Sequence, residues 1–500
     1  MPLLKSGAKH RRGMASLAKA SEYALDAELA GLYSQQLCVS PLSECVVSQD
    51  DGPAASEGLA RLRTHQMDRW RSALLGTIAA SSLFVYGGRP ARADCLGTST
   101  TLTCTGIIAG TASPGIANGG IDVPTGYTTL NVNHLDADIK PYSGVDGILV
   151  VSTGDVAIVS NTTDGAVAHA ISVTGVGADG INAQSYAGAV TVGSTGDITS
   201  TNGRGIYARN FAQGAGDISV TSAGTIIADS DGINARAYSG AAAVNSTGDI
   251  TSTNGQGIIA TSAGDIAVTS VGAINAYANG INARSTTGAV TVNSSGDITS
   301  AIGQGIYARS VTGAVTIGST GDITSTNGRG IWATTYGAGD ISVTSSGNIN
   351  ASEGILALSG TGAVTVTSTG DITSTNGRGI IAANFASGAG DVSVTSNGAI
   401  NAYSDGISAT ASTGAVTVNS AGDITSTNGR GIAASNGGAG DVSVTSVGAI
   451  NANSDGISAT SNYGAVSVES TGDITSTTGR GINARNFASG AGDVSVTSKG

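Results

Sequence analysis

The sequence predicts an all-β, right-handed parallel β-helix whose turns are about 25 residues long and hold three strands each. A Gly-Ile pair recurs at intervals of 23 to 27 residues, and three stretches of alternating apolar and polar residues fill each interval. No segment of the repeats shows a helical period, which excludes folds that alternate strands with helices. The isoleucines of the thirteen pairs are Ile181, Ile206, Ile233, Ile258, Ile281, Ile306, Ile331, Ile355, Ile380, Ile407, Ile432, Ile457 and Ile482.

One repeat, residues 188–212, illustrates the pattern. Its stretches read Ala-Val-Thr-Val, Gly-Asp-Ile-Thr-Ser and Gly-Ile-Tyr-Ala-Arg. Val190 and Val192, then Ile198, then Ile206 and Ala208 keep the period of two that a strand shows when one face is buried. Asn and Gly residues in the intervening turns are expected to adopt left-handed backbone angles. Val and Ile of successive turns are expected to stack in columns inside the tube.

Aspartate follows a longer period of about 50 residues. At the start of the first stretch the residues are Ala189, Asp217, Ala241, Asp265 and Ala289. The second stretch has the opposite phase, with Asp197, Thr225, Asp249, Ala273 and Asp297, a slip at Asp322, and then Asp371, Ala399, Asp423, Ala449 and Asp473. Stacked strands lie roughly 4.8 Å apart. We interpret the alternation as a way of separating like charges in one column.

The residue before each Gly-Ile pair forms a second charge pattern. Positive and negative residues alternate along it, except for three successive amides: Arg204, Asp231, Gln256, Asn279, Gln304, Arg329, Glu353, Arg378, Asp405, Arg430, Asp455 and Arg480. This pattern predicts a surface ladder of opposite charges between adjacent turns. Exposed pairs contribute roughly 0–1 kcal/mol each. Such a ladder would mainly determine which turn stacks on which.

Charge also limits the possible partners. After residue 93, 12 Lys and Arg residues stand against 27 Asp and Glu residues, a formal charge of 12 − 27 = −15. An acidic surface poor in lysine repels phosphate backbones, so no nucleic-acid partner is expected.

Residues 67–93 have the features of an export signal. Arg69 and Arg71 precede an apolar run over residues 72–86, and Ala91 and Ala93 supply the small residues of a cleavage site after Ala93. Our hypothesis is that translation starts at Met67, so that residues 1–66 come from an over-extended gene prediction. A genuine N-terminal extension, partly helical over residues 15–37, is the alternative.

The expected mature chain has two parts. Residues 94–164 would form an N-terminal cap and irregular first turns, and residues 165–500 the repetitive β-helix, truncated at its C-terminus because it ends within a turn at Gly500. Cys95 and Cys104 either close a small disulfide loop in an oxidising compartment or remain free thiols.

The sequence gives little support for an enzyme. His134 and His169 are the only histidines after residue 93, and both precede the repeats. Charged residues recur in columns, whereas polysaccharide-cleaving β-helices have an irregular cluster of acidic and basic groups. We therefore predict no enzymatic activity, no catalytic, cofactor-binding or metal-binding residues, and no cofactor.

Three further motifs favour structural interpretations. Asp229-Ser230-Asp231-Gly232 resembles a calcium loop, but neighbouring repeats do not keep both aspartates. Asn-Gly-Arg, first at Asn202, is an ordinary tight-turn sequence. Thr199-Ser200-Thr201 is too soon interrupted by turn residues to form a flat, ice-binding threonine face.

The signal, the two early cysteines and the Gly-Asp-Ile-Thr-Ser-Thr-Asn-Gly-Arg-Gly-Ile repeats together resemble the autotransporter passengers of Gram-negative bacteria. The resemblance covers residues 67–500 and is strongest after about residue 188. It implies a C-terminal outer-membrane β-barrel, here in a missing part of the protein, and a location at the cell surface, in the outer membrane or outside the cell. Large exoproteins exported by a separate barrel usually carry an Asn-Pro-Asn-Gly motif, and this chain contains no Asn-Pro pair.

Three function classes follow from this resemblance. The first is a passenger that mediates adhesion, aggregation or biofilm contact, with a host or neighbouring cell surface or a polysaccharide as its partner. The second is a passive β-helical stalk or a partner-secreted exoprotein. The third, a polysaccharide-active enzyme, is the least favoured.

Overall fold

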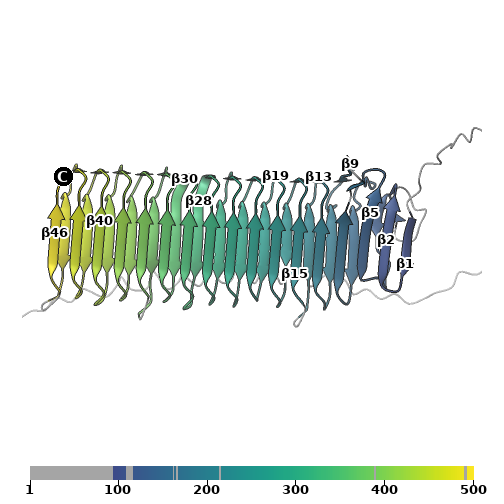
Figure 1. The fold of residues 1–500 in the computed structure, drawn as a ribbon, viewed down its shortest axis with the longest axis horizontal. Helices are drawn as coiled ribbons and strands as arrows, with labels where there is room; N and C mark the ends of the chain where they lie inside the picture. The colour runs from purple at the N-terminus through teal and green to yellow at the C-terminus, as the bar shows by residue number, and fades with distance from the viewer. Residues whose placement is uncertain are drawn as a thin grey trace, which may run out of the picture. The chain divides into compact units, whose positions relative to one another are not determined.

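The computed structural model describes residues 94–108, 116–161, 163–164, 167–212, 216–387, 390–488 and 492–500. These residues form an all-β parallel solenoid of about 15 turns with about 25 residues per turn, which confirms the predicted fold. In Figure 1 the arrows of one sheet lie side by side from the purple N-terminal turns to the yellow C-terminal ones, and all except the first strand point the same way. No helix in the described ranges is long and apolar enough to cross a membrane. Residues 1–66 and the expected signal at 67–93 lie outside these ranges.

Each turn places one strand in a 17-stranded sheet, which we call the first row. Its strands are β1 (Asp94–Thr98), β2 (Thr101–Gly106), β5 (Thr129–Leu135), β7 (Val156–Asn161), β12 (Val190–Ser194), β15 (Ile218–Ser222), β18 (Ala242–Ser246), β21 (Ile266–Ser270), β24 (Val290–Ser294), β27 (Val315–Ser319), β29 (Ile341–Ser345), β31 (Val364–Ser368), β34 (Val392–Ser396), β37 (Val416–Ser420), β40 (Val442–Ser446), β43 (Val466–Ser470) and β46 (Val494–Ser498).

A 27-stranded sheet contains the other two strands of each turn, the second and third rows. The second row comprises β10 (Ile171–Val173), β13 (Ile198–Ser200), β16 (Ile226–Ala228), β19 (Ile250–Ser252), β22 (Ile274–Ala276), β25 (Ile298–Ser300), β32 (Ile372–Ser374), β35 (Ile400–Ala402), β38 (Ile424–Ser426), β41 (Ile450–Ala452) and β44 (Ile474–Ser476). The third row comprises β6 (Ile148–Ser152), β11 (Ile181–Ser185), β14 (Ile206–Asn210), β17 (Ile233–Arg236), β20 (Ile258–Ser262), β23 (Ile281–Ser285), β26 (Ile306–Ser310), β33 (Ile380–Asn384), β36 (Ile407–Ala411), β39 (Ile432–Asn436), β42 (Ile457–Ser461) and β45 (Ile482–Asn486).

A few strands depart from this plan. β28 (Ile323–Thr335) and β30 (Ile349–Ser359) each run through both the second and the third row, and their pairing shifts register between Ser325 and Arg329. Near the N-terminal end, β3 (Ile116–Ala117) and β4 (Gly120–Asp122) form an antiparallel pair, as do β8 (Thr163–Asp164) and β9 (Val167–Ala168).

Equivalent strands of successive turns pair in parallel and in register. Val190 of β12 lies opposite Ile218 of β15, and Ile206 of β14 lies opposite Ile233 of β17. A slip of one residue would turn every buried side chain outward, so the apolar pattern fixes the register. The predicted columns of Val and Ile are confirmed: Ile206 is fully buried, like the isoleucine of almost every Gly-Ile pair. Burial of one such side chain stabilises the fold by about 1.5–3 kcal/mol.

The glycine of the Gly-Ile pair is required because there is no room for a side chain. A Cβ atom on Gly257 would lie 2.3 Å from Cγ2 of Ile274 and 2.6 Å from the carbonyl oxygen of Gly280 in the next turn. The expectation that Asn and Gly residues in the turns of the repeats adopt left-handed backbone angles is wrong. Among the described residues, every positive φ lies at or before Gly177. Tight stacking, not turn conformation, therefore selects glycine in the repeats.

Serine also faces the interior, which the apolar pattern did not predict. In the second row, Oγ of Ser200 donates to the carbonyl oxygen of Ala178 in the preceding turn at 2.7 Å and accepts from the amide of Gly203 at 3.0 Å. In the first row, Ser222 is fully buried, and its Oγ has no hydrogen-bond partner. Serine thus serves two roles, one as a turn acceptor and one as a small space-filling residue.

A disulfide hairpin covers the N-terminal end of the first row. β1 pairs antiparallel with β2, which pairs in parallel with β5, and Cys95 and Cys104 lie opposite each other and form a disulfide. Of the two alternatives for these cysteines, the disulfide is confirmed. The hairpin adds β1 to the edge of β2, so that the outer strand of the first-row sheet is a short strand held by the disulfide.

Candidate binding surface

The aspartates of the first and second rows bind the turn that follows them. Oδ1 of Asp217 accepts the amide of Ala241 at 2.8 Å, and Oδ1 of Asp249 accepts the amide of Ala273 at 2.8 Å. Where the alternation slips, Oδ1 of Asp297 accepts the amide of Asp322 at 2.9 Å. These carboxylates satisfy backbone amides at the strand starts. The aspartates therefore have a structural role. The interpretation of their alternation as a separation of like charges did not predict this role.

The residues before the Gly-Ile pairs, which we call the corner column, form the predicted ladder at four ion pairs. The N–O distances are 3.1 Å for Arg204–Asp179, 2.6 Å for Arg329–Glu353, 3.6 Å for Arg378–Asp405 and 3.1 Å for Arg430–Asp405. The expectation of a purely exposed ladder is wrong, because Asp179 and Asp405 are buried. Oδ1 of Asp405 also accepts the amide of Arg430 at 2.9 Å, so the turn backbone holds the carboxylate in place.

Two aspartates of this column have pKa values shifted in opposite directions. Burial raises the pKa of Asp179 and outweighs the charge and hydrogen bonds of Arg204. Burial also acts to raise the pKa of Asp455, but hydrogen bonds from the Arg480 amide and the Asn483 side chain, together with the nearby arginine charges, lower it overall. The surroundings of each of these two aspartates therefore determine the direction of its pKa shift.

Aromatic side chains gather on the outside of the solenoid. A row of them, the aromatic row, occupies the turn that follows the third-row strands: Tyr186, Phe211, Tyr238, Tyr336, Phe385, Tyr463 and Phe487. All except Phe211 are more than half exposed. The rings of Tyr186 and Phe211 stack with their centroids 5.4 Å apart. Six of the seven residues lie five positions after the isoleucine of a Gly-Ile pair, and Tyr463 lies six after it, so alignment of the repeats on these pairs would have revealed the row from the sequence.

A second aromatic group lies on the outer face of the third row. Tyr307 and Trp332 occupy paired positions in β26 and β28, with ring centroids 4.6 Å apart. The guanidinium of Arg329 lies 4.5 Å from the centre of the Trp332 ring, and that of Arg204 lies 3.6 Å from the centre of the Tyr207 ring. Arginines of the corner column thus stack on aromatic rings three residues further along the same turn.

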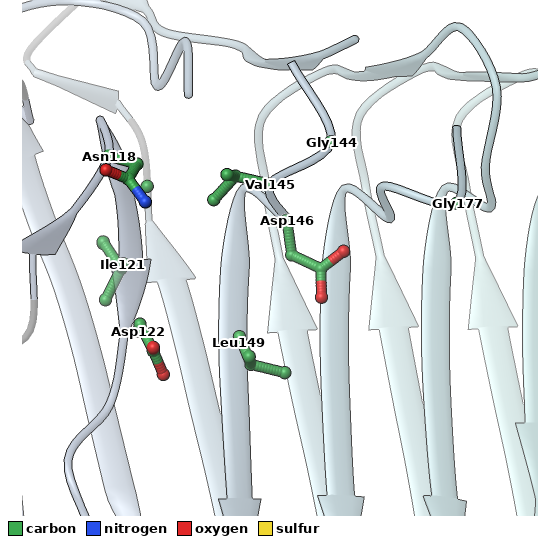
Figure 2. Close-up of a pocket in the computed structure, with 9 residues that line it drawn as sticks. Asn118, Ile121, Asp122, Gly144, Val145, Asp146, Leu149 and Gly177 are labelled. Atoms are coloured by element: carbon green, nitrogen blue, oxygen red, sulfur yellow. The ribbon is translucent and has the colours of Figure 1, made fainter. Parts of the chain in front are cut away.

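A pocket of about 390 Å³ lies on the N-terminal turns (Figure 2). Asn118, Asp122 and Asp146 contribute polar groups, beside the apolar side chains of Val145 and Leu149. Asp146 is already bonded to the next turn, because it accepts the Asp179 amide at 2.7 Å and the Asn182 side chain at 2.8 Å. Partial burial, followed by the charge of Asp146, raises the pKa of the Asp122 carboxyl. The pocket has the size of a small-ligand site but few free polar groups.

The residues that the sequence analysis considered as candidate sites lie in different elements of the structure. His169 lies 3.7 Å from Asp138, whereas His134 belongs to β5. Asp229 accepts hydrogen bonds from Thr253 and Asn254 of the next turn. Ser200 is buried, so Thr199-Ser200-Thr201 does not form a flat outer face. Within the described ranges, no group of three potential metal ligands occurs.

The surface therefore consists of structural acidic columns, an aromatic row and an aromatic–arginine face. Comparison of the chain with family models, curated proteins and solved structures finds no match.

Proposed function

We propose that this protein is an exported surface protein of a Gram-negative bacterium, an autotransporter passenger that mediates adhesion, aggregation or biofilm contact through its aromatic row. The carrying observation is the placement of the aromatic side chains. Beyond residue 93 the chain has 14 aromatic residues, and nine of them are among its exposed large hydrophobic side chains. A row of exposed rings is costly to keep in water unless it meets a partner.

Aromatic side chains supply much of the binding energy at protein interfaces. The aromatic row has members in seven turns between Tyr186 and Phe487, so a surface with many copies of one ligand would engage several rings at once. Such multivalent contact raises avidity without requiring strong individual sites. The Cys95–Cys104 disulfide supports export, since disulfides persist in oxidising compartments.

Adhesion of beads coated with the purified full-length chain tests the proposal on bacterial cells, host cells and an abiotic surface. The variant Phe385→Ser/Tyr463→Ser removes two exposed rings of the aromatic row, and we expect it to lose most of the adhesion. Tyr277→Ser/Tyr403→Ser is the matched control, because Tyr277 and Tyr403 are similarly exposed but follow second-row strands. Equal losses in both variants would contradict a role of the aromatic row. No adhesion by the unmodified chain would favour a passive stalk.

Export needs its own measurement. We expect protease added to intact cells to digest the chain and a thiol reagent to label Cys95 and Cys104 only after reduction. Protection from the protease together with labelling before reduction would contradict a surface location.

A further inference from the structure

All ten arginines beyond residue 93 lie beside the outer face of the third row. Five belong to the corner column: Arg204, Arg329, Arg378, Arg430 and Arg480. The other five occupy the fourth position of third-row strands: Arg209, Arg236, Arg284, Arg309 and Arg485. Since this part of the protein has a net charge of −15 (12 − 27), it concentrates its positive charge on one face.

Four of these arginines form what we call the unpaired arginine column: Arg209, Arg236, Arg284 and Arg309. Arg209 lies opposite Arg236 in adjacent strands, and Arg284 lies opposite Arg309. No carboxylate of the described residues forms an ion pair with any of the four, in contrast to the corner column. Like charges in directly paired positions destabilise a sheet. An unneutralised column of this kind is therefore a cost to the fold that an anionic ligand would relieve.

Existing contacts orient the guanidinium groups but leave donors free. Nη1 of Arg209 donates to the hydroxyl of Tyr207 at 3.2 Å, and Nε of Arg236 donates to the side chain of Asn234 at 2.8 Å. Nε of Arg309 has no hydrogen-bond partner, but it is buried, so a ligand would bind the terminal Nη groups of this side chain. Each guanidinium carries five N–H donors, so most remain available to carboxylate oxygens.

Aromatic rings border the column on both sides. The guanidinium of Arg209 lies 4.2 Å from the ring centre of Phe211, and that of Arg309 lies 4.8 Å from the ring centre of Tyr336, both in the aromatic row. Tyr307 occupies the outward position two residues before Arg309 and is partly exposed, whereas Tyr207, in the equivalent position before Arg209, is buried. Aromatic rings thus lie next to the guanidinium groups at the two ends of the column, at Arg209 and at Arg309.

We propose that the unpaired arginine column and its bordering rings bind an acidic polysaccharide, a chain of uronic acid sugars that runs along the solenoid axis. Each carboxylate would accept two N–H bonds from one guanidinium. The apolar faces of the sugar rings would pack against the aromatic side chains. The inference rests on the adhesive function proposed above and names its partner.

A polyuronate fits better than a nucleic acid. The acidic columns of the first and second rows repel a double-stranded nucleic acid most strongly, because its two phosphate backbones carry about one charge per 1.7 Å of helix axis. A polyuronate carries one carboxylate per sugar and needs only the few arginines of this column. The column contains no lysine, which suits a planar, bidentate partner.

The test measures binding of the purified full-length chain to polygalacturonate, with neutral dextran and single-stranded DNA as comparison probes. Arg284→Gln/Arg309→Gln removes two members of the unpaired column. Arg378→Gln/Arg430→Gln removes the same charge from the corner column and is the matched control. We expect the first variant to weaken polygalacturonate binding at least about tenfold, because charge-assisted hydrogen bonds are lost. We expect the control to weaken it by less than about twofold, with unchanged secondary structure in both.

Three results would overturn the inference: equal weakening by both variants, equal binding of dextran, or tighter binding of single-stranded DNA. The bead assay separates this inference from the proposed function. Adhesion to cells without binding of polygalacturonate would refute the acidic polysaccharide and leave adhesion standing. Loss of both would refute the adhesive function as well.

Discussion

The N-terminal turns, up to Gly177, and the regular turns after them use the same residue types for different reasons. In the N-terminal turns, Gly126, Gly144 and Gly177 have positive φ and open space around the position of a Cβ atom. In the regular turns, Gly257 has an ordinary φ but no space for a side chain. The first group is selected for backbone conformation and the second for contact with the next turn.

The difference shows what regular stacking does to a sequence. Once turns stack in register, each position is repeated above and below itself, and the neighbouring turn determines which side chain fits. In the irregular turns, the residue's own backbone conformation has the larger influence. Each of the following predictions tests whether the neighbouring turn decides the effect of a substitution.

The largest effect is expected for Gly257→Ala. The new methyl group would overlap Ile274 and the carbonyl of Gly280, so the turns must separate, and we expect a loss of about 3 kcal/mol in the free energy of unfolding. Gly144→Ala introduces only an unfavourable φ and should cost about 1 kcal/mol. Denaturant unfolding of the three proteins measures both changes.

Gly154→Ala is the control for this pair, because Gly154 has open space and no positive φ. We expect it to change stability by less than about 0.5 kcal/mol. If Gly144→Ala proved costlier than Gly257→Ala, contact with the next turn would not be the reason for glycine in the repeats.

The next effect concerns Arg430, which pairs with the buried Asp405 of the preceding turn. Arg430→Asp would place a second carboxylate beside Asp405, and we expect a loss of about 2 kcal/mol. Arg430→Gln should lose under about 1 kcal/mol, because Gln256 already occupies the equivalent place beside Asp231, where its backbone N–H donates to Oδ1 of Asp231 at 3.1 Å. Thermal unfolding compares the two variants, and equal effects would exclude a charge ladder.

Much of this architecture was predictable from the sequence. The Gly-Ile spacing and the alternation at Val190, Val192 and Ile198 predicted the solenoid, its three rows and its apolar columns, since strand periodicity is local information. The corner ladder also followed from the sequence, because the period of the repeat brings Asp405 beside Arg430. Position along the repeat was therefore enough to predict contact between turns.

The remaining features depend on distances that spacing does not give. The burial of Asp179, the absence of room at Gly257 and the two kinds of inward serine appear only once the turns have been stacked. The long strand β28 was not predicted either, since its sequence Thr-Asn-Gly-Arg is the same as that of ordinary turns. The unpaired arginine column could not be predicted, because the sequence does not show which arginines have a carboxylate within ion-pair distance.

The serines provide a smaller test with opposite signs. Ser200→Ala removes the acceptor of the Gly203 amide and the donor to the Ala178 carbonyl, so we expect a loss of about 1.5 kcal/mol. Ser222→Ala removes a buried hydroxyl that has no partner and should leave stability unchanged or raise it by up to about 1 kcal/mol. Urea unfolding midpoints distinguish the two. Similar losses at both positions would mean that Ser222 has a bonding role.

The smallest effect is expected from Asp179 and Asp455, which share the corner column but have oppositely shifted pKa values. The raised pKa of Asp179 favours its protonated form in the folded state, so its contribution to stability falls as pH rises from the ordinary value of 3.8 through the folded-state pKa. The lowered pKa of Asp455 gives stability above 3.8 that is lost as pH falls through its folded-state pKa. Asparagine is a suitable replacement, because Asn279 already accepts the amide of Gln304 at 2.8 Å in this column.

Thermal unfolding of the unmodified chain, Asp179→Asn and Asp455→Asn at several pH values therefore gives two difference curves. We expect acid to stabilise the unmodified chain relative to Asp179→Asn and to destabilise it relative to Asp455→Asn. If only the carboxylates of the column itself shifted the two pKa values, the change of stability with pH would have the same sign in both difference curves. Opposite signs mean that the neighbouring turns, one supplying burial and the other donors and positive charge, set the titration of each aspartate.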